Sequence, residues 1–147
     1  MLRVPLQQLD ADLPPPSYAR EGDAGADLVA TADAVLRCRG GRAVVPTGVA
    51  VAIPTGFAGF VLPRSGLAAR HGLTCLNAPG LIDSGFRGEL KVILVNHDPE
   101  HDYTVRRGDR VAQLVLVKVE QAAFELVGKG GLEDSQRGTG GFGHTGT

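Results

Sequence analysis

The sequence predicts an all-β protein, built as a barrel or a sandwich, with one short helix and a glycine-rich C-terminal arm. Gly and Pro are frequent, with 21 and 9 residues, and they separate short runs of β-branched and apolar residues along most of the chain. The length of 147 residues allows one domain with one hydrophobic core. We therefore expect a β-barrel domain over residues 1–127 and a flexible arm over residues 128–147.

Four runs have the pattern expected of strands. Apolar residues alternate with smaller ones in residues 49–53, and a Pro-Thr-Gly turn follows. Residues 57–62 form the next apolar run. Residues 90–95 place apolar side chains on one face and a mixture on the other. Residues 110–119 are rich in Val and Leu and form the longest predicted strand.

Two segments differ from this strand pattern. Residues 65–70, SGLAAR, have a helical composition, but they form only a short plug or lid rather than a layer of the fold. The arm contains eight glycines, and its only large apolar residues are Leu132 and Phe142. Such a segment buries too little surface to offset its loss of conformational entropy, so we expect it to be mobile until a ligand holds it.

Composition excludes several classes of protein. The 15 Lys and Arg are balanced by 16 Asp and Glu, which disfavours binding to a nucleic acid polymer. No stretch approaches the about 20 apolar residues of a membrane span, and the first residues lack the apolar run of a signal peptide. Cys38 and Cys75 form no C-x-x-C pair, so we expect two reduced thiols in a cytoplasmic protein, with a single bridge between them as the alternative.

Two familiar motifs are misleading in this chain. Residues 138–143 match G-x-G-x-x-G, but only four residues follow, too few for the helix that receives a dinucleotide. Residues 97–101 match H-x-x-E-H, but Pro99 interrupts the helix that this zinc motif requires, so we predict a turn between strands. The chain has no P-loop motif.

Two polar segments in the first half of the chain have residues that suit the binding of ions. Residues 23–28, DAGADL, place carboxylates beside small residues, which suits a hard cation, although a solvated turn has the same composition. Arg64 and Ser65 stand where a strand ends and the short helix begins, a place that favours an anion. The alternative there is a Ser N-cap beside an exposed Arg.

Two further polar segments follow. In residues 80–90 we predict a tight hairpin that presents Asp83 near Phe86, an arrangement suited to a general base beside a ring-stacking surface. An ordinary hairpin with a turn Asp and a packed Phe is the alternative. At the start of the last strand, Gln113 could donate to a phosphate, whereas Asp109 and Arg110 are predicted only to pair with each other.

The arm carries the fifth polar segment. Arg137 and Phe142 lie on a glycine-rich stretch, which fits a lid that is ordered by charge and stacking when a ligand arrives, unless the segment is simply disordered. Each of the five segments has an ordinary structural explanation. Their joint occurrence does not.

In this order, the five segments resemble the five motifs of the trimeric dUTP diphosphatases, and the resemblance extends from Leu13 to Gly146. It implies a jelly-roll-like β-barrel and a homotrimer with three shared active sites, each built from two protomers and the arm of the third. It also implies hydrolysis of dUTP to dUMP and pyrophosphate with Mg²⁺, which limits uracil in DNA and supplies dUMP for thymidylate synthesis.

The resemblance assigns a role to each site residue. Asp83 would be the base for water attacking the α-phosphorus, and Asp27 would hold the Mg²⁺ shell through water. Arg137 would reach the γ-phosphate, and Phe142 would cover the uracil. The implied phosphate-binding residues are Arg64, Ser65, Gly66, Gln113, Arg137, Gly138, His144 and Thr145. The implied uracil- and deoxyribose-binding residues are Asn77, Gly80, Ile82, Asp83, Phe86, Lys91 and Phe142.

The chain departs from the family pattern at two of these positions. Phe86 stands where the family usually has Tyr, so the ring that packs on the sugar is kept but its hydroxyl is lost. His144 stands where the family usually has Ser, which introduces a group that titrates near neutral pH.

Two other functions compete with this reading. A dCTP deaminase would be a related barrel enzyme, but its catalytic glutamate aligns with Ile93, which cannot move protons. A non-catalytic nucleotide sensor or protein-binding module is the other alternative. The presence of Asp27, Arg64, Asp83 and Arg137 argues against a loss of catalysis.

Overall fold

The computed structural model describes residues 2–140, and its fold is almost entirely β-strand. Two four-stranded sheets and one two-stranded sheet contain all the strands of this range. The elements are β1 (Leu6–Gln8), β2 (Ala26–Val29), β3 (Ala34–Leu36), β4 (Gly41–Val51), β5 (Phe57–Pro63), α1 (Ser65–His71), β6 (Leu73–Cys75), β7 (Gly80–Ile82), β8 (Glu89–Asn96), β9 (Tyr103–Val105) and β10 (Arg110–Lys118).

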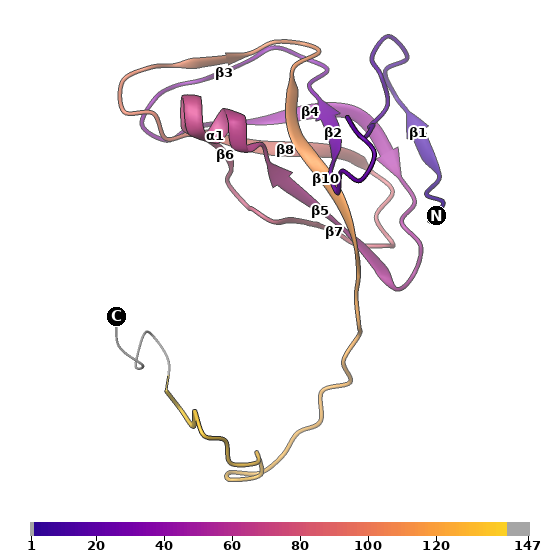
Figure 1. The fold of residues 1–147 in the computed structure, drawn as a ribbon, viewed down its shortest axis with the longest axis vertical. Coiled ribbons are helices and arrows are strands. Elements are labelled where there is room, and N and C mark those ends of the chain that lie inside the picture. Colours follow the sequence, from indigo (N-terminus) through magenta and orange to yellow (C-terminus); the bar gives the residue numbers. More distant parts are fainter. Residues whose placement is uncertain (1, 141–147) are drawn as a thin grey trace.

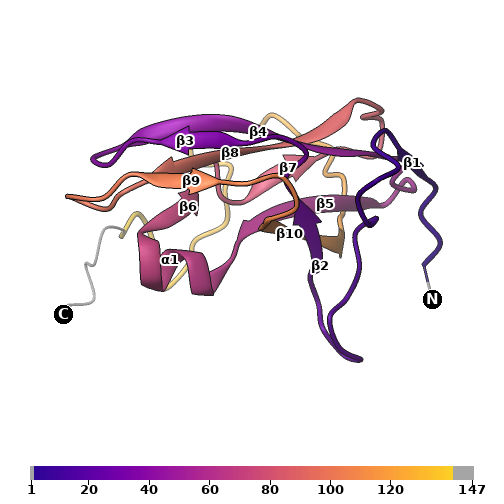
Figure 2. The ribbon, with the colours of Figure 1, turned by 90° about the horizontal axis from the view of Figure 1, so that it is seen from above.

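The strand order interleaves distant parts of the chain. The first sheet has the order β1-β4-β8-β6, the second has the order β2-β10-β5-β7, and β3 pairs with β9. Every strand pair is antiparallel. β4 and β8 lie in one layer and β5 and β10 in the other (Figure 2). This arrangement confirms the predicted all-β, jelly-roll-like class, although the sheets stay open at their edges rather than closing into one ring of paired strands.

Alternating side chains fill the space between the layers. Leu90, Val92 and Leu94 of β8 are each about 1% exposed, whereas Lys91 between them faces outward. This is the alternation that the sequence predicts, since successive side chains of a strand point to opposite faces of its sheet. The inward-facing residues of β2, β4 and β10 join the same apolar core.

The predicted hairpin over residues 80–90 is wrong. β7 pairs with β5 in the second sheet, whereas β8 pairs with β4 and β6 in the first. The loop between β7 and β8 therefore crosses from one layer to the other. Two short apolar runs separated by glycines indicate strands, but they do not reveal whether the strands pair with each other.

The longest strand is also not the predicted one. β4 has 11 residues and β10 has 9. The pairing of β4 with β8 shifts register between Pro46 and Ala50. The sequence analysis predicted only its second half, residues 49–53; Pro46 and Gly48 lie at the irregular pairing, where Gly48 has φ of +68°.

The predicted short helix is confirmed as α1. It begins directly after β5 and ends at Gly72, which adopts the left-handed conformation that favours glycine. A Cβ atom at Gly72 would come within 2.8 Å of the Asp98 backbone nitrogen, so the loop after β8 packs closely against the helix end. This helix fixes where the chain after β5 turns into β6.

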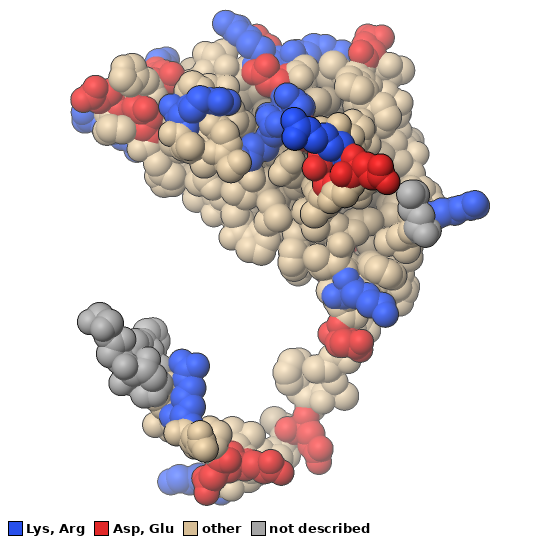
Figure 3. Space-filling view, viewed as in Figure 1, with Lys and Arg blue, Asp and Glu red and all other residues tan. Residues whose placement is uncertain are grey.

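Residues 119–140 form neither helix nor strand. The Val119 amide donates to the Gly56 carbonyl, and beyond it the segment runs away from the sheets (Figure 1). Phe124 and Leu126 on this segment are 95% and 100% exposed. On the face in Figure 3, charged side chains of both signs gather along the upper rim and along this segment. Within residues 2–140, no helix is long and apolar enough to cross a membrane.

Candidate active site

Three neighbouring strands bring the predicted phosphate-binding residues together. β10 lies between β2 and β5, and its register places Gln113 opposite Asp27. Arg64 follows the last residue of β5, which pairs with β10 at Ala112. The Gln113 amide nitrogen donates to Asp27 Oδ1 over 3.3 Å. Asp27 and Gln113 are more than 80 positions apart in the sequence. Strand pairing nevertheless brings them into one cluster with Arg64.

Asp27 is the centre of this cluster. Its side chain is only 10% exposed, and Arg64 Nε lies 3.3 Å from Oδ1. Arg110 Nη1 donates to Oδ2 over 3.2 Å. Two guanidinium groups thus compensate one buried carboxylate, which is the usual condition for burying such a charge.

Arg110 is a site residue that the sequence analysis missed. The predicted pair between Asp109 and Arg110 is wrong, because the Asp109 carboxylate instead accepts from the Arg106 amide in the turn before β10. Arg110 points to Asp27 and its carbonyl accepts from Arg64 Nη1 over 3.3 Å. Side chains three residues apart on a regular strand point to opposite faces, so the spacing from Gln113 gave no signal; the register shift between Arg110 and Ala112 lets both side chains reach Asp27.

Local packing fixes the geometry of this end of the site. A Cβ atom at Gly25, just before β2, would lie 3.0 Å from the Cβ atom of Gln113, so glycine lets the chain approach β10 closely here. Ser65 is the first residue of α1, and Gly66 follows it. The N-cap is Arg64, with no side-chain cap, so the alternative of a Ser N-cap is excluded. Ser65 and Gly66 stand next to Arg64 at this end of β5, where the phosphate-binding role was predicted.

The turn before β10 is held by ion pairs. Arg107 contacts the Asp10 carboxylate and donates to the Thr31 carbonyl, and Arg106 pairs with Asp33 over 2.8 Å. The pKa of Asp33 lies below its usual value. The main cause is the hydrogen bond that its carboxylate accepts from the Arg107 amide, and the second is the hydrogen bond that it accepts from the Arg106 guanidinium. These contacts tie the start of β10 to two loops and so hold Arg110 and Gln113 in register.

The predicted uracil-binding residues lie on and around β7. Gly80 pairs with Val61 and Ile82 with Gly59, and Asp83 follows directly. The chain reaches β7 through Asn77, whose amide nitrogen would lie 3.3 Å from a Cβ atom at Gly80. Asp83 is exposed, and its carbonyl accepts from the Phe86 amide over 3.1 Å. Asp83 and Phe86 therefore share one turn, as predicted.

Phe86 and Lys91 lie further along the same connection. A Cβ atom at Gly88 would come within 2.7 Å of the Phe86 ring, so the ring rests on the Gly88 backbone. Phe86 is 42% exposed and presents its other face to solvent. Lys91 Nζ lies 3.7 Å from Glu89 on the outer side of β8, and the structure shows no contact between Lys91 and Asp83.

Asp83 and Arg64 lie at opposite ends of β5, whereas Gly80 pairs nearer the end that Arg64 follows. Ile82 pairs with Gly59 near the start of this strand, whereas Arg64 lies just beyond its end. At about 3.3 Å per residue, Asp83 and Arg64 are separated by roughly 20 Å along the sheet. The predicted phosphate-binding residues and the predicted base are therefore far apart within one chain.

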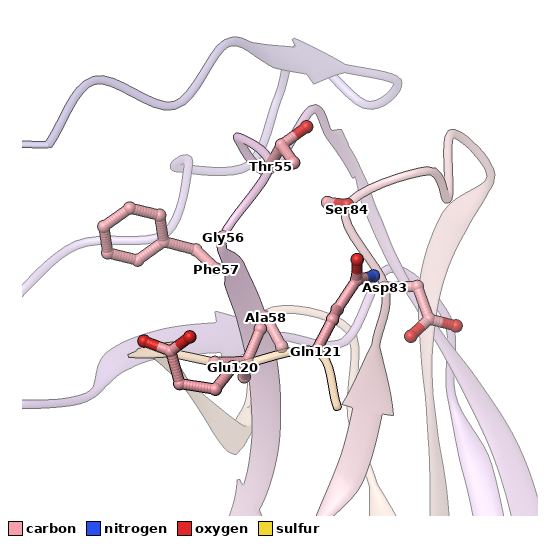
Figure 4. A pocket seen from close by; sticks show the side chains of 9 residues that line it. Thr55, Gly56, Phe57, Ala58, Asp83, Ser84, Glu120 and Gln121 are labelled. Carbon is pink, nitrogen blue, oxygen red and sulfur yellow. The ribbon is translucent and has the colours of Figure 1, made fainter. Parts of the chain in front are cut away.

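A hollow of about 460 Å³ lies beside Asp83. Its wall comes from the turn before β5, the Asp83–Ser84 backbone and residues 119–121 after β10. The carboxylates of Asp83 and Glu120 point away from each other on either side of β5, and the Phe57 ring is directed out of the hollow (Figure 4). It includes none of the predicted phosphate-binding residues.

The arm residues are separate from both groups. The Arg137 guanidinium donates to the Gly140 carbonyl over 2.9 Å, and the Gly138 amide donates to Ser135. These contacts stay within one turn of the arm. Phe142, His144 and Thr145 lie outside the described residues.

The donor groups fit a magnesium ion that is held mainly by substrate. No group of three or more His, Cys, Asp or Glu side chains within residues 2–140 could hold a metal ion. Both Asp27 oxygens already lie within 3.3 Å of arginine or glutamine nitrogens. Mg²⁺ usually keeps several waters and binds one or two carboxylates together with substrate phosphates. Contact through water is therefore the role that the Asp27 environment allows.

Comparison with known proteins identifies the family. A family model described as dUTPase matches residues 11–146. The deoxyuridine 5'-triphosphate nucleotidohydrolase of Thermobifida fusca is 59% identical over 145 residues, which cover 99% of this chain and 79% of that protein. The protein of the same name from Rhodococcus erythropolis is 52% identical over 145 residues, which cover 99% of this chain and 87% of that one.

Solved structures of dUTPases share the fold. The dUTPase of Staphylococcus bacteriophage 80alpha with dUPNHPP is 28% identical, with a TM-score of 0.86, and the match covers 100% of both chains. A mutant dUTPase from phage phi11 of S. aureus, described with the coordination of a structural Mg(II) ion, is 25% identical with a TM-score of 0.76. That match covers 86% of this chain and 97% of the phage chain.

Proposed function

Because the chain belongs to the dUTPase family and hydrolyses dUTP, we propose that the residues at the two ends of β5 meet at an interface between protomers. The observation that carries this proposal is the separation of about 20 Å between Asp83 and Arg64. A general base must lie within hydrogen-bond reach of the water that it activates, directly or through one water. Asp83 and Arg64 of one protomer therefore cannot serve the same α-phosphate.

A second copy of the chain resolves this difficulty. Each site would combine the phosphate-binding end of one protomer with the Asp83 end of its neighbour. The arm, which leaves the sheets after Val119, would bring Arg137 and Phe142 from a third protomer. Such a site would require a homotrimer with shared active sites, in which residues 1–127 would be the hydrolase domain and residues 128–147 the closing arm.

We propose that Asp83 accepts the proton of the water that attacks the α-phosphorus, which releases dUMP and pyrophosphate. Arg64, Ser65, Gly66 and Gln113 would hold the phosphate chain. Mg²⁺ bound to the triphosphate would neutralise its charge, and Asp27 would hold the ion through water. Phosphoryl transfer depends chiefly on alignment and charge stabilisation, and these residues supply both.

The phosphate end contains the charges that this role needs. Arg64 lies 3.3 Å from Asp27 and is about one quarter exposed, so it can turn towards an arriving phosphate. Arg110 stays beside Asp27 and keeps the buried carboxylate compensated. The pair with Asp27 would thus keep Arg64 close to the triphosphate before it turns to bind.

The base end would select the nucleoside. The backbone around Gly80 and Ile82, with Asn77, would contact the uracil edge, and the Phe86 ring would lie against the deoxyribose. Ile93 on β8 is half-buried and has no ionisable group, which leaves a deaminase without its acid-base residue. Both cysteines are free thiols, as a reducing, cytoplasmic location would require.

The reaction is tested by incubating the protein and Mg²⁺ separately with dUTP, dCTP, dTTP and UTP and resolving the products by ion-exchange chromatography. We expect dUMP and pyrophosphate from dUTP alone. Ammonia and a uracil nucleotide from dCTP would instead indicate a deaminase. Binding of dUTP without turnover would indicate a nucleotide sensor.

A further inference from the structure

The loop between β7 and β8 carries Asp83 and Phe86, but no sheet supports it. β7 and β8 belong to different sheets, so residues 83–88 have no ladder of strand hydrogen bonds. The turn from Asp83 to Phe86 has one backbone hydrogen bond of 3.1 Å. The shape of this loop must therefore come from side chains.

The Arg87 side chain makes two short hydrogen bonds within this loop. Its Nη1 atom donates to the Ser84 carbonyl over 2.6 Å and to the Phe86 carbonyl over 2.7 Å. A charged donor makes stronger hydrogen bonds than a neutral one. One guanidinium thus joins two carbonyls of the turn that lies between Asp83 and Gly88.

The Phe86 ring is held in place by its contact with the backbone of Gly88. Gly88 has no side chain, and a Cβ atom there would come within 2.7 Å of the ring tip and 3.1 Å of the ring edge. The ring consequently rests on the Gly88 backbone, while Arg87 holds the Phe86 carbonyl. Both the backbone and the ring of Phe86 have a defined position.

Glu89 anchors the end of the loop. Its Oε1 atom accepts from the Gly48 amide over 3.0 Å at the bulge of β4. Its side chain is 23% exposed, so solvent competes only partly for this bond. The loop is therefore joined to β4 immediately after Gly88.

We propose that Arg87 is a positioning residue for substrate selection, which it exerts by holding the loop of residues 83–88 rigid. This inference rests on the proposed role of the loop as the wall beside the deoxyribose and uracil. A pocket excludes an added methyl or hydroxyl group only modestly, by about 10- to 200-fold, and less when its wall yields. A rigid wall beside Phe86 is thus required for discrimination, and Arg87 provides the rigidity.

The test compares Arg87→Gln, Arg87→Lys and the exposed control Arg3→Gln. For each variant, kcat and KM are measured with dUTP, UTP and dTTP. We expect Arg87→Gln to lower the preference for dUTP over UTP and dTTP by about 10-fold, mainly through KM. Arg87→Lys should retain part of the preference because the ammonium still donates to a carbonyl, and Arg3→Gln should match the wild type.

Hydrogen exchange of the amides in residues 83–88 supplies a second readout. Exchange should be faster in Arg87→Gln, while the melting temperature remains close to that of the wild type. Glu89→Ala should act in the same direction, and Glu89→Gln, which keeps an acceptor oxygen, should act less. An unchanged preference together with unchanged exchange in Arg87→Gln would overturn the inference, as would a melting temperature that falls while the preference stays constant. A wild type that does not hydrolyse dUTP would contradict the proposed function instead.

Discussion

The two ends of β5 are built in different ways. At the end next to α1, Asp27, Arg64 and Gln113 come from three neighbouring elements, and the register of the sheet brings them together. At the other end, Asp83 and Phe86 lie on one loop whose own residues hold its shape. The phosphate end depends on pairing between strands that are distant in sequence, whereas the base end depends on local contacts and one anchor to β4.

This difference explains why each end is only half of a site. The phosphate end has positive charge and a buried carboxylate but no exposed base, because both Asp27 oxygens are occupied by neighbouring donors. The base end has an exposed carboxylate and an aromatic ring, but none of the predicted phosphate-binding residues lines the hollow beside Asp83. Each end supplies what the other lacks.

Deletion of residues 128–147 should have the largest effect, because it removes the proposed third contribution while leaving both ends of β5 intact. An arginine delivered late to a phosphoryl transfer site is worth about 10³–10⁵ in kcat. We expect a loss of about 10³-fold or more, with the circular dichroism spectrum retained since the last strand ends at Lys118. Arg137→Ala should reproduce much of the loss and Lys129→Ala should not. Full activity without the arm would show that the two ends suffice.

Arg110→Gln should affect only the phosphate end. Without Arg110, Arg64 becomes the sole guanidinium beside Asp27 and is less available to phosphate. We expect KM for dUTP to rise about 10-fold, a change of about 1.4 kcal/mol, with a smaller change in kcat. Steady-state kinetics measure it, and Arg20→Gln, an exposed arginine outside the cluster, is the control. An unchanged KM would mean that Arg110 has only a structural role.

Part of this comparison could be predicted from the sequence. The apolar alternation of β8, the helix after β5 and the chemistry of Arg64, Asp83 and Gln113 are local or depend on side-chain type. The partner of Arg110 could not be predicted, because Asp27 lies 83 positions away and only strand pairing brings the two together.

The sequence also could not predict that the loop after β7 crosses from one sheet to the other, because this too depends on strand pairing between distant residues. Glycines and a short apolar run indicate a turn between strands, but which strands then pair depends on the whole set of sheets. β4 shows a related limit, because only residues 49–53 were predicted, and the strand extends back to Gly41 through an irregular pairing with β8 between Pro46 and Ala50.

Gly25→Ala should weaken the phosphate end more mildly. The added methyl group would lie 3.0 Å from the Gln113 Cβ atom and 3.2 Å from its Cδ atom, which is tighter than ordinary contact. We expect Gln113 to shift and KM for dUTP to rise several-fold, by about 0.5–1 kcal/mol. Ala24→Ser, at the exposed neighbouring position, should leave the kinetics unchanged. If both variants behave alike, close packing at Gly25 does not position Gln113.

The smallest effect concerns Cys75, which ends β6 just before the chain turns towards the base end. Burial raises the pKa of its thiol from 9.0 to about 11. The unfolded chain therefore ionises this thiol at lower pH than the folded chain, so stability is lost as pH rises from about 9 to about 11. Urea unfolding at pH 8 and pH 10 should show a larger decrease for the wild type than for Cys75→Ala. Cys38→Ala should show the same decrease as the wild type.

The shared site is tested most directly by mixing two inactive variants. Asp83→Asn removes the base and Arg64→Gln removes a phosphate contact, and each alone should lower kcat by about 10²–10⁴-fold. The two are unfolded and refolded together at equal amounts, beside controls refolded alone. If Asp83 and Arg64 of one site come from different protomers, roughly a quarter of the sites in a random mixture are intact and activity returns to that level. Activity that stays at the average of the two separate variants would contradict the account, because it would place both residues in the same protomer.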